Sequence, residues 1–172
     1  VGVSTRDLAS ATSGELVELL ADDNLFWRMR AQRAIVDRAS QQTAPDQDVV
    51  MALVGLVKNR TVDAIGLDPG AIHALWALQG LGALDDATHQ KALLTSSAPL
   101  RRNAIRALGV DAAAQKRFFG SGVVADKDPA TRLAALVKLL EFPTSPEIKT
   151  LVRGLAGDPA VLADEWGRPW TA

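Results

Sequence analysis

The chain has 172 residues, of which 48% are hydrophobic and 23% charged, and its formal net charge is -1. This length allows one domain with a substantial core, and the near-neutral charge argues against a whole-domain electrostatic grip on nucleic acid. The absence of cysteine excludes disulfides, thiolate metal sites and thiol catalysis within this chain. The sequence begins at Val1 without a signal-peptide pattern, so we expect it to be a piece of a longer protein.

Five segments are predicted to form the first helix of successive helix pairs. The stretch "DVVMALVGLVK" from Asp48 and the stretch "PEIKTLVRGL" from Pro146 both carry apolar residues at helical spacing. No stretch shows sustained period-two alternation, so no strand is predicted. The five predicted first helices are 14–22, 46–58, 85–95, 111–125 and 145–156, of which 85–95 has the weakest pattern.

The second helix of each pair is predicted from a capping residue at its start. Ser and Asp side chains can accept a hydrogen bond from the free N–H groups of a first helical turn. Proline is favoured immediately after such a cap, because its missing N–H is not needed there. The predicted starts are Asp23, Asp68, Ser97, Asp128 and Asp158, and the prolines that follow a cap are Pro69, Pro129 and Pro159.

A small residue recurs at one position of the second helices, namely Ala31, Ala74, Ala104 and Ala135. Alanine at such a position lets neighbouring helices approach closely. A period of about 30 to 45 residues with two helices per unit is typical of an α-solenoid. The sequence therefore predicts an all-α fold: a right-handed α–α superhelix of the HEAT or armadillo kind, with about five helix pairs over 13–172 and a flanking segment at 1–12.

The stretch "GAIHALWALQGLGAL", residues 70 to 84, is apolar nearly all round. It is too short for a membrane span, which needs about 20 apolar residues. We therefore expect a helix covered on both faces, with Trp76 and Leu78 in the core. The stretch "LRRNAIRAL" is instead amphipathic. Its predicted core face is Leu100, Ala104, Ile105 and Leu108, and its predicted solvent face is Arg101, Arg102 and Arg106.

No residue pattern points to catalysis, a cofactor or a metal. His73 and His89 lack ligand spacing, and the acidic pairs at 22–23, 85–86 and 164–165 fall where helices are expected to start. The stretch "FFGSG" at 118–122 lacks the pattern of a phosphate loop, and we interpret it as a helix end. We expect no catalytic, cofactor-binding or metal-binding residue in this chain.

Basic and aromatic side chains define a candidate interaction surface. Arginines on the predicted second helices either form a stripe that contacts phosphates or an acidic protein, or pair with turn aspartates of neighbouring units, which we favour. Trp27 lies at a predicted helix start, and Trp166 and Trp170 lie close to the end of the sequence. Exposed tryptophans there would mark a surface covered by further sequence. The arginines are Arg28, Arg30, Arg33, Arg101, Arg102, Arg106 and Arg132.

The region 13–170 resembles HEAT-type repeats, through an Asp-Pro turn followed by arginine, alanine and leucine, as in "DPATRLAAL". Three stretches are similar to the HEAT-like segment of bacterial putative membrane-bound dehydrogenases with a c-type heme-binding domain. They are "ELVELLADDNLFWRMRAQRAIVDRA", "HALWALQGLGALDD" and "PLRRNAIRAL".

This resemblance implies a periplasmic or cell-surface parent protein, with a sugar-dehydrogenase-like propeller before the helices and a cytochrome domain after them. Heme c and the cofactor of a sugar dehydrogenase would belong to that parent, because none of the family's catalytic or heme residues maps onto this chain.

The sequence therefore predicts a non-catalytic scaffold that docks or spaces neighbouring domains, or binds a protein partner as a regulatory adaptor. Some HEAT-like solenoids act instead as DNA alkyl-base glycosylases or bilin lyases, and these remain alternatives. A glycosylase needs a basic groove in which a tryptophan and an aspartate are poised together. The net charge of -1 argues against nucleic acid as a partner.

Overall fold

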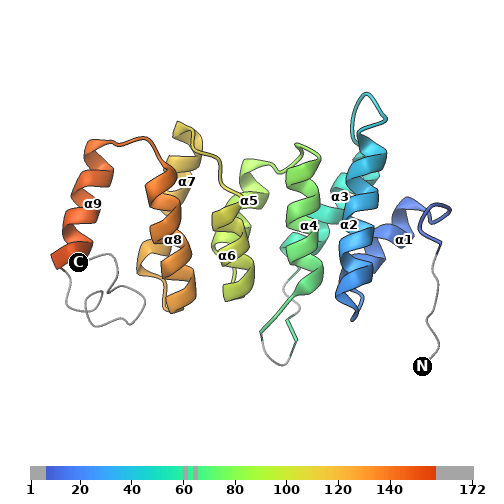
Figure 1. Cartoon of the computed structure of the whole chain (residues 1–172), viewed down its shortest axis with the longest axis horizontal. Helices are drawn as coiled ribbons and strands as arrows, with labels where there is room; N and C mark the ends of the chain where they lie inside the picture. Colours follow the sequence, from blue (N-terminus) through green and yellow to red (C-terminus); the bar gives the residue numbers. More distant parts are fainter. Residues whose placement is uncertain (1–6, 60–61, 64–65, 158–172) are drawn as a thin grey trace. The chain divides into compact units, whose positions relative to one another are not determined.

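The computed structural model describes residues 7–59, 62–63 and 66–157, and this part of the chain consists of helices joined by turns and loops (Figure 1). It contains nine α-helices and two 3-10 turns, and no strand within those ranges. The predicted all-α class is thus confirmed. No helix in the described ranges is long and apolar enough to cross a membrane. The chain divides into two compact units, Val1–Ala104 and Ile105–Ala172.

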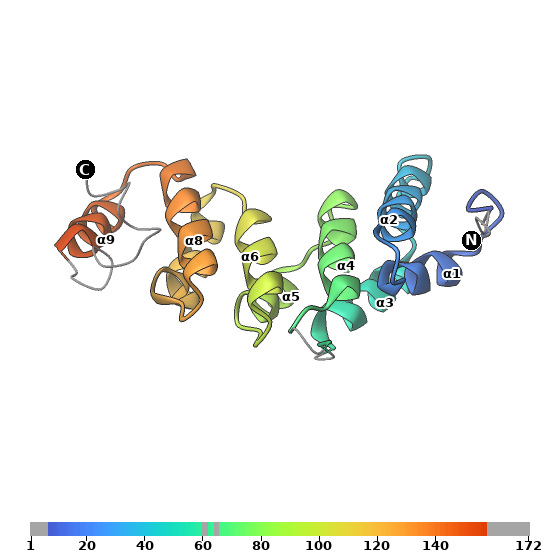
Figure 2. The same cartoon turned by 60° about the horizontal axis from the view of Figure 1, so that its bottom comes forward.

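In unit 1 the helices alternate between two rows. Helix α4 packs against α2, α3 and the η1 turn, while α3 also contacts α1 and α5. Figures 1 and 2 show α2 and α4 side by side, with α3 in the other row. The elements are α1 (Ser13–Glu18), η1 (Leu19–Ala21), α2 (Leu25–Ala39), α3 (Gln47–Lys58), α4 (Pro69–Gly80), α5 (Asp86–Leu93) and α6 (Ala98–Arg106), whose last two residues belong to unit 2.

Capping side chains start these helices, as the sequence predicted, with one correction. The Asp68 carboxylate accepts from the Ala71 N–H at 2.9 Å, and Pro69 takes the first helical position of α4. The predicted cap Asp23 is wrong, because Asn24 caps α2 by accepting from the N–H of Phe26. Asp22 instead accepts from the N–H of Asn24, which orders the turn one residue earlier.

The core of unit 1 includes one half of α4, whose buried residues are Gly70, Ala71, Ala74, Leu75, Ala77 and Leu78. The rest of this helix is half-buried or exposed, so the prediction that it is covered on both faces is corrected. The recurring alanines Ala31, Ala74 and Ala104 are fully buried, as expected for positions where helices approach closely. Leu78 is also fully buried, but Trp76 is only half-buried, so its prediction as a core residue is corrected. The largest buried side chains of this core are Leu16, Leu20, Leu53, Leu75, Leu78, Leu93 and Leu100.

Unit 2 contains α7 (Ala112–Ser121), η2 (Val123–Ala125), α8 (Pro129–Glu141) and α9 (Pro146–Gly157). The helix predicted over 111–125 is divided because Gly122 adopts a left-handed φ of 68°, a conformation that favours glycine and ends a helix. The "FFGSG" stretch is therefore a helix end, as predicted. Phe118 packs edge-on against Phe142, with ring centroids 5.2 Å apart.

Buried Ala135 and Leu139 on α8 also belong to the core of unit 2, and Ala135 is fully buried like the other recurring alanines. Asp128 caps α8 by accepting from the N–H of Thr131, and Pro129 takes its first helical position. The predicted fifth helix start at Asp158, with Pro159, lies outside the described residues.

Candidate interaction surface

Three of the predicted interface arginines fold back onto the turn that precedes their own helix. Arg28 on α2, Arg101 on α6 and Arg132 on α8 each donate from one guanidinium nitrogen to two consecutive main-chain carbonyls. In all three cases the accepting residues lie six and five positions earlier in the chain. We call Arg28, Arg101 and Arg132 the turn-clamp arginines.

The distances agree closely between the three clamps. Arg101 Nη1 lies 2.8 Å from the Thr95 oxygen and 3.0 Å from the Ser96 oxygen. Arg132 Nη1 lies 2.7 and 3.3 Å from the oxygens of Asp126 and Lys127. Arg28 Nη1 lies 2.5 and 3.0 Å from the oxygens of Asp22 and Asp23. Charge-assisted bonds of this kind fix the turn that leads into each second helix.

Helix α4 lacks a clamp because Ile72 occupies the corresponding position. The two carbonyls that an arginine would bind there have other donors. Ser97 Oγ donates to the Gly66 oxygen at 3.2 Å, and the Asp63 N–H donates to the Leu67 oxygen at 2.8 Å. The turn before α4 is thus tied to the start of α6 by a serine instead.

The turn clamp corrects the prediction that Arg101 faces solvent, since this residue is only 6% exposed. Its long side chain lies along the first turn of α6, where its charge meets carbonyl oxygens. Phosphates and turn aspartates were the predicted partners of these arginines, and the main-chain carbonyls were not among them. The signal was present, because each turn-clamp arginine holds the same position, four residues after a predicted cap or its neighbour.

Two side-chain pairs join α4 to α2 and to α6 in unit 1. Gln32 Oε1 on α2 lies 2.7 Å from His73 Nδ1 on α4, within hydrogen-bond distance. Trp76 on α4 donates its indole N–H to Asn103 Oδ1 on α6 at 2.9 Å. Burial and the nearby positive charge of Arg28 lower the pKa of His73 below its usual value. His73 is therefore neutral at pH 7 and acts as a structural residue.

The outer face of α2 is the most apolar exposed helix surface in the described part of unit 1. Leu25, Phe26 and Met29 are 52%, 57% and 58% exposed, and their spacing puts them on one side of the helix. Arg30 and Arg33 are exposed on the same helix, one turn further on. Trp27 is half-buried and packs edge-on against Phe26, with ring centroids 5.0 Å apart.

The other predicted surface residues that the structure describes belong to other helices. Arg102 is half-buried on α6, and Arg106 is exposed in the last turn of the same helix. Arg132 is engaged in its turn in unit 2. Trp166 and Trp170 lie outside the described residues.

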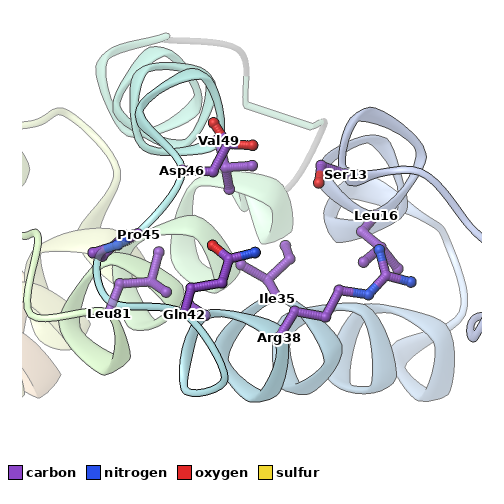
Figure 3. Close-up of a pocket in the computed structure, with 10 residues that line it drawn as sticks. Ser13, Leu16, Ile35, Arg38, Gln42, Pro45, Asp46, Val49 and Leu81 are labelled. Carbon is purple, nitrogen blue, oxygen red and sulfur yellow. The ribbon is translucent and has the colours of Figure 1, made fainter.

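A small cavity lies between α1, α2 and α3 in unit 1 (Figure 3). Its volume of about 50 Å³ is well below the roughly 300 Å³ at which small-molecule pockets begin. The Arg38 side chain at its edge donates to the carbonyls of Leu8, Ala9 and Ala11, so its charge holds the 7–12 segment against α2. This cavity has room for a water molecule and not for a cofactor.

The described residues contain no group of three or more histidine, aspartate or glutamate side chains placed to hold a metal ion. His89 is buried and its Nε2 lies 2.8 Å from the Ala104 oxygen, so this nitrogen is used within the fold. The acidic residue Asp85 caps α5 by accepting from the N–H of Thr88 at 2.8 Å. His89 and Asp85 thus both make hydrogen bonds within the fold.

The described residues thus define an all-helical protein with clamped turns and an apolar, basic face on α2. Comparisons with protein-family models, curated proteins and solved structures found no match for this chain.

Proposed function

We propose that this chain is a non-catalytic helical-repeat scaffold, whose outer surface docks a protein partner or neighbouring domains of a longer protein. In this proposal the helix pairs stack in chain order as a right-handed α–α superhelix of the HEAT kind. The observation that carries the proposal is the turn clamp, which recurs with the same geometry before α2, α6 and α8.

The clamp supports a scaffold for two reasons. The same local structure before three helices is expected of a repeated unit, in which each turn must hold the next helix at a fixed angle. The clamp also uses the charge of Arg28, Arg101 and Arg132 inside the fold, which removes three of the cations that a phosphate-binding stripe would need. Because these three side chains stabilise turns within the fold, they favour a scaffold over a nucleic-acid enzyme.

The resemblance to dehydrogenases with a c-type heme domain extends the proposal to the parent protein. In such a parent the helices would space a sugar-oxidising domain and a cytochrome domain in the periplasm or at the cell surface. Heme c and the sugar-dehydrogenase cofactor would bind to those domains. The full gene tests this extension, because a Cys-x-x-Cys-His motif following the helical region supports it and an unrelated flanking domain contradicts it.

Small-angle X-ray scattering tests the repeat architecture. A compact domain of this length has a radius of gyration of about 16 Å, and a single file of helix pairs has a larger value with an elongated distance distribution. A compact particle would contradict the superhelix. Retention of duplex DNA at about 50 mM salt, or cofactor absorbance in the purified chain, would contradict a non-catalytic protein scaffold.

A further inference from the structure

We infer that the outer face of α2 is a docking site for an acidic amphipathic helix of a partner protein. The inference rests on the proposed scaffold function and names the chemistry of its partner. We define the α2 face by its exposed apolar residues Leu25, Phe26 and Met29 and its exposed arginines Arg30 and Arg33.

The apolar half of the α2 face lacks a cover in the described structure. Three of the first five residues of α2 are large, apolar and more than half exposed. Their positions along the helix place the three side chains within about a third of its circumference, where they form a continuous strip. Contiguous apolar side chains of this kind mark protein-interaction surfaces, because isolated exposed residues are common and clusters are not.

The charge of the α2 face selects the partner. Arg30 makes no hydrogen bond or ion pair with the described residues, and Arg33 pairs only with Asp37, over 3.2 Å and with both side chains mostly exposed. Such an exposed pair contributes little and is readily exchanged for another carboxylate. A partner with carboxylates opposite Arg30 and Arg33 therefore gains charge-assisted hydrogen bonds at little cost.

A groove of about 480 Å³ adjoins the basic end of the α2 face and is also lined by Leu8 and Ala9. Its lining includes Arg30, Arg33 and Arg38 but only one carboxylate, Asp37, so the groove is electropositive. Asp22 and Asp23 precede the opposite, apolar end of the helix. This asymmetry fixes a direction: the partner's apolar residues lie over Phe26 and its carboxylates lie toward Arg33.

A second groove, between α3 and α5, is larger but fits a partner less well. It has a volume of about 620 Å³ and offers Lys58 and Lys91 with a single exposed large apolar side chain, Leu94. It lacks the apolar strip that anchors an amphipathic helix. We therefore use it as the control surface.

The test measures binding of a fluorescent synthetic helix to the complete chain by fluorescence anisotropy. The probe has about 18 residues, enough to follow α2. Its binding face carries leucines along the half that lies over Phe26 and glutamates along the half that lies toward Arg33. Its isomer carries lysine at every glutamate position. We expect the glutamate probe to saturate below about 100 µM and the lysine isomer to bind at least about tenfold more weakly.

Two variants locate the site. Phe26→Ser with Met29→Ser, and Arg30→Glu with Arg33→Glu, should each weaken binding of the glutamate probe about tenfold or more. The control variant Lys58→Glu with Leu94→Ser should change it less than about twofold. The four side chains changed in the two α2 variants are exposed, and so are Lys58 and Leu94 in the control variant. Circular dichroism should therefore report unchanged helix content.

Several outcomes would overturn the inference. These are failure of the glutamate probe to bind, equal binding of its lysine isomer, or full binding by both α2 variants. Sedimentation velocity that shows self-association lost in the Phe26→Ser, Met29→Ser variant would assign the face to a second copy of this chain instead. None of these results bears on the small-angle X-ray scattering test. If the chain is an elongated monomer that does not bind the probe, the docking site on α2 is contradicted and the proposed scaffold function is not.

Discussion

Trp76 and Asn103 join α4 to α6 through one hydrogen bond, in which the indole N–H donates to the amide oxygen at 2.9 Å. The Asn103 amide nitrogen donates in turn to the Pro99 oxygen at 2.9 Å, so the asparagine is held by its own helix. The acceptor of the indole N–H is thus held in place by a second hydrogen bond within α6. A half-buried indole N–H that lost its acceptor would depend on water for a partner.

Replacing Asn103 by leucine should therefore reduce the free energy of unfolding by about 1 kcal/mol, measured by urea denaturation. The Asn103→Asp variant keeps an oxygen for Trp76 but replaces the donor to the Pro99 oxygen with a second acceptor. It should lie between wild type and the leucine variant. Equal stability of wild type and Asn103→Leu would mean that the hydrogen bond contributes nothing.

The turn clamp predicts an unequal effect of two arginine substitutions. Arg132→Met removes the donor to the carbonyls of Asp126 and Lys127, and we expect it to lower the free energy of unfolding by about 1 to 3 kcal/mol. Arg30→Met is the matched control, because Arg30 is exposed and should change stability by less than about 0.5 kcal/mol. Similar losses in both variants would show that the clamp has no special role.

Two glycines should respond to alanine in opposite directions. A Cβ added at Gly80 would lie 2.9 Å from Val36 Cγ2, because α4 and α2 approach closely there. Gly55 lies within α3 and a Cβ there would meet nothing within 4 Å. Gly55→Ala should stabilise by about 0.5 to 1 kcal/mol through helix propensity, whereas Gly80→Ala should destabilise by about 1 to 3 kcal/mol through overpacking. Thermal unfolding of both variants checks the two signs, and a gain in stability from Gly80→Ala would contradict this packing.

His73 predicts a pH dependence of stability. Its pKa is lowered in the folded state, first by burial and second by the charge of Arg28. The unfolded chain therefore takes up the proton first as the pH falls, and protonation favours unfolding. The free energy of unfolding should decrease as the pH falls below about 6.5, the ordinary histidine pKa, and be regained above it.

The His73→Gln variant cannot take up this proton, so its stability should vary less between pH 5 and pH 7.5, in buffers of about 0.1 M ionic strength. Denaturant unfolding at each pH gives the comparison. Parallel curves for the variant and the wild type would assign the pH dependence to other groups.

The sequence by itself determined the helical class, most helix starts and the recurring buried alanines. These features depend on local signals: a capping side chain such as Asp68, a proline such as Pro129, and apolar residues at helical spacing. Such signals act within one or two helical turns, so they can be detected without knowing what the helix packs against.

Only the tertiary structure decided where several polar side chains lie. Lysine side chains are mostly exposed in proteins, yet Lys138 is 5% exposed and donates to the Leu108 oxygen, thirty residues away, at 2.8 Å. The pairing of Gln32 with His73 likewise joins residues 41 positions apart. A buried polar group must find a hydrogen-bond partner, and when that partner comes from another segment, its identity depends on how the helices pack.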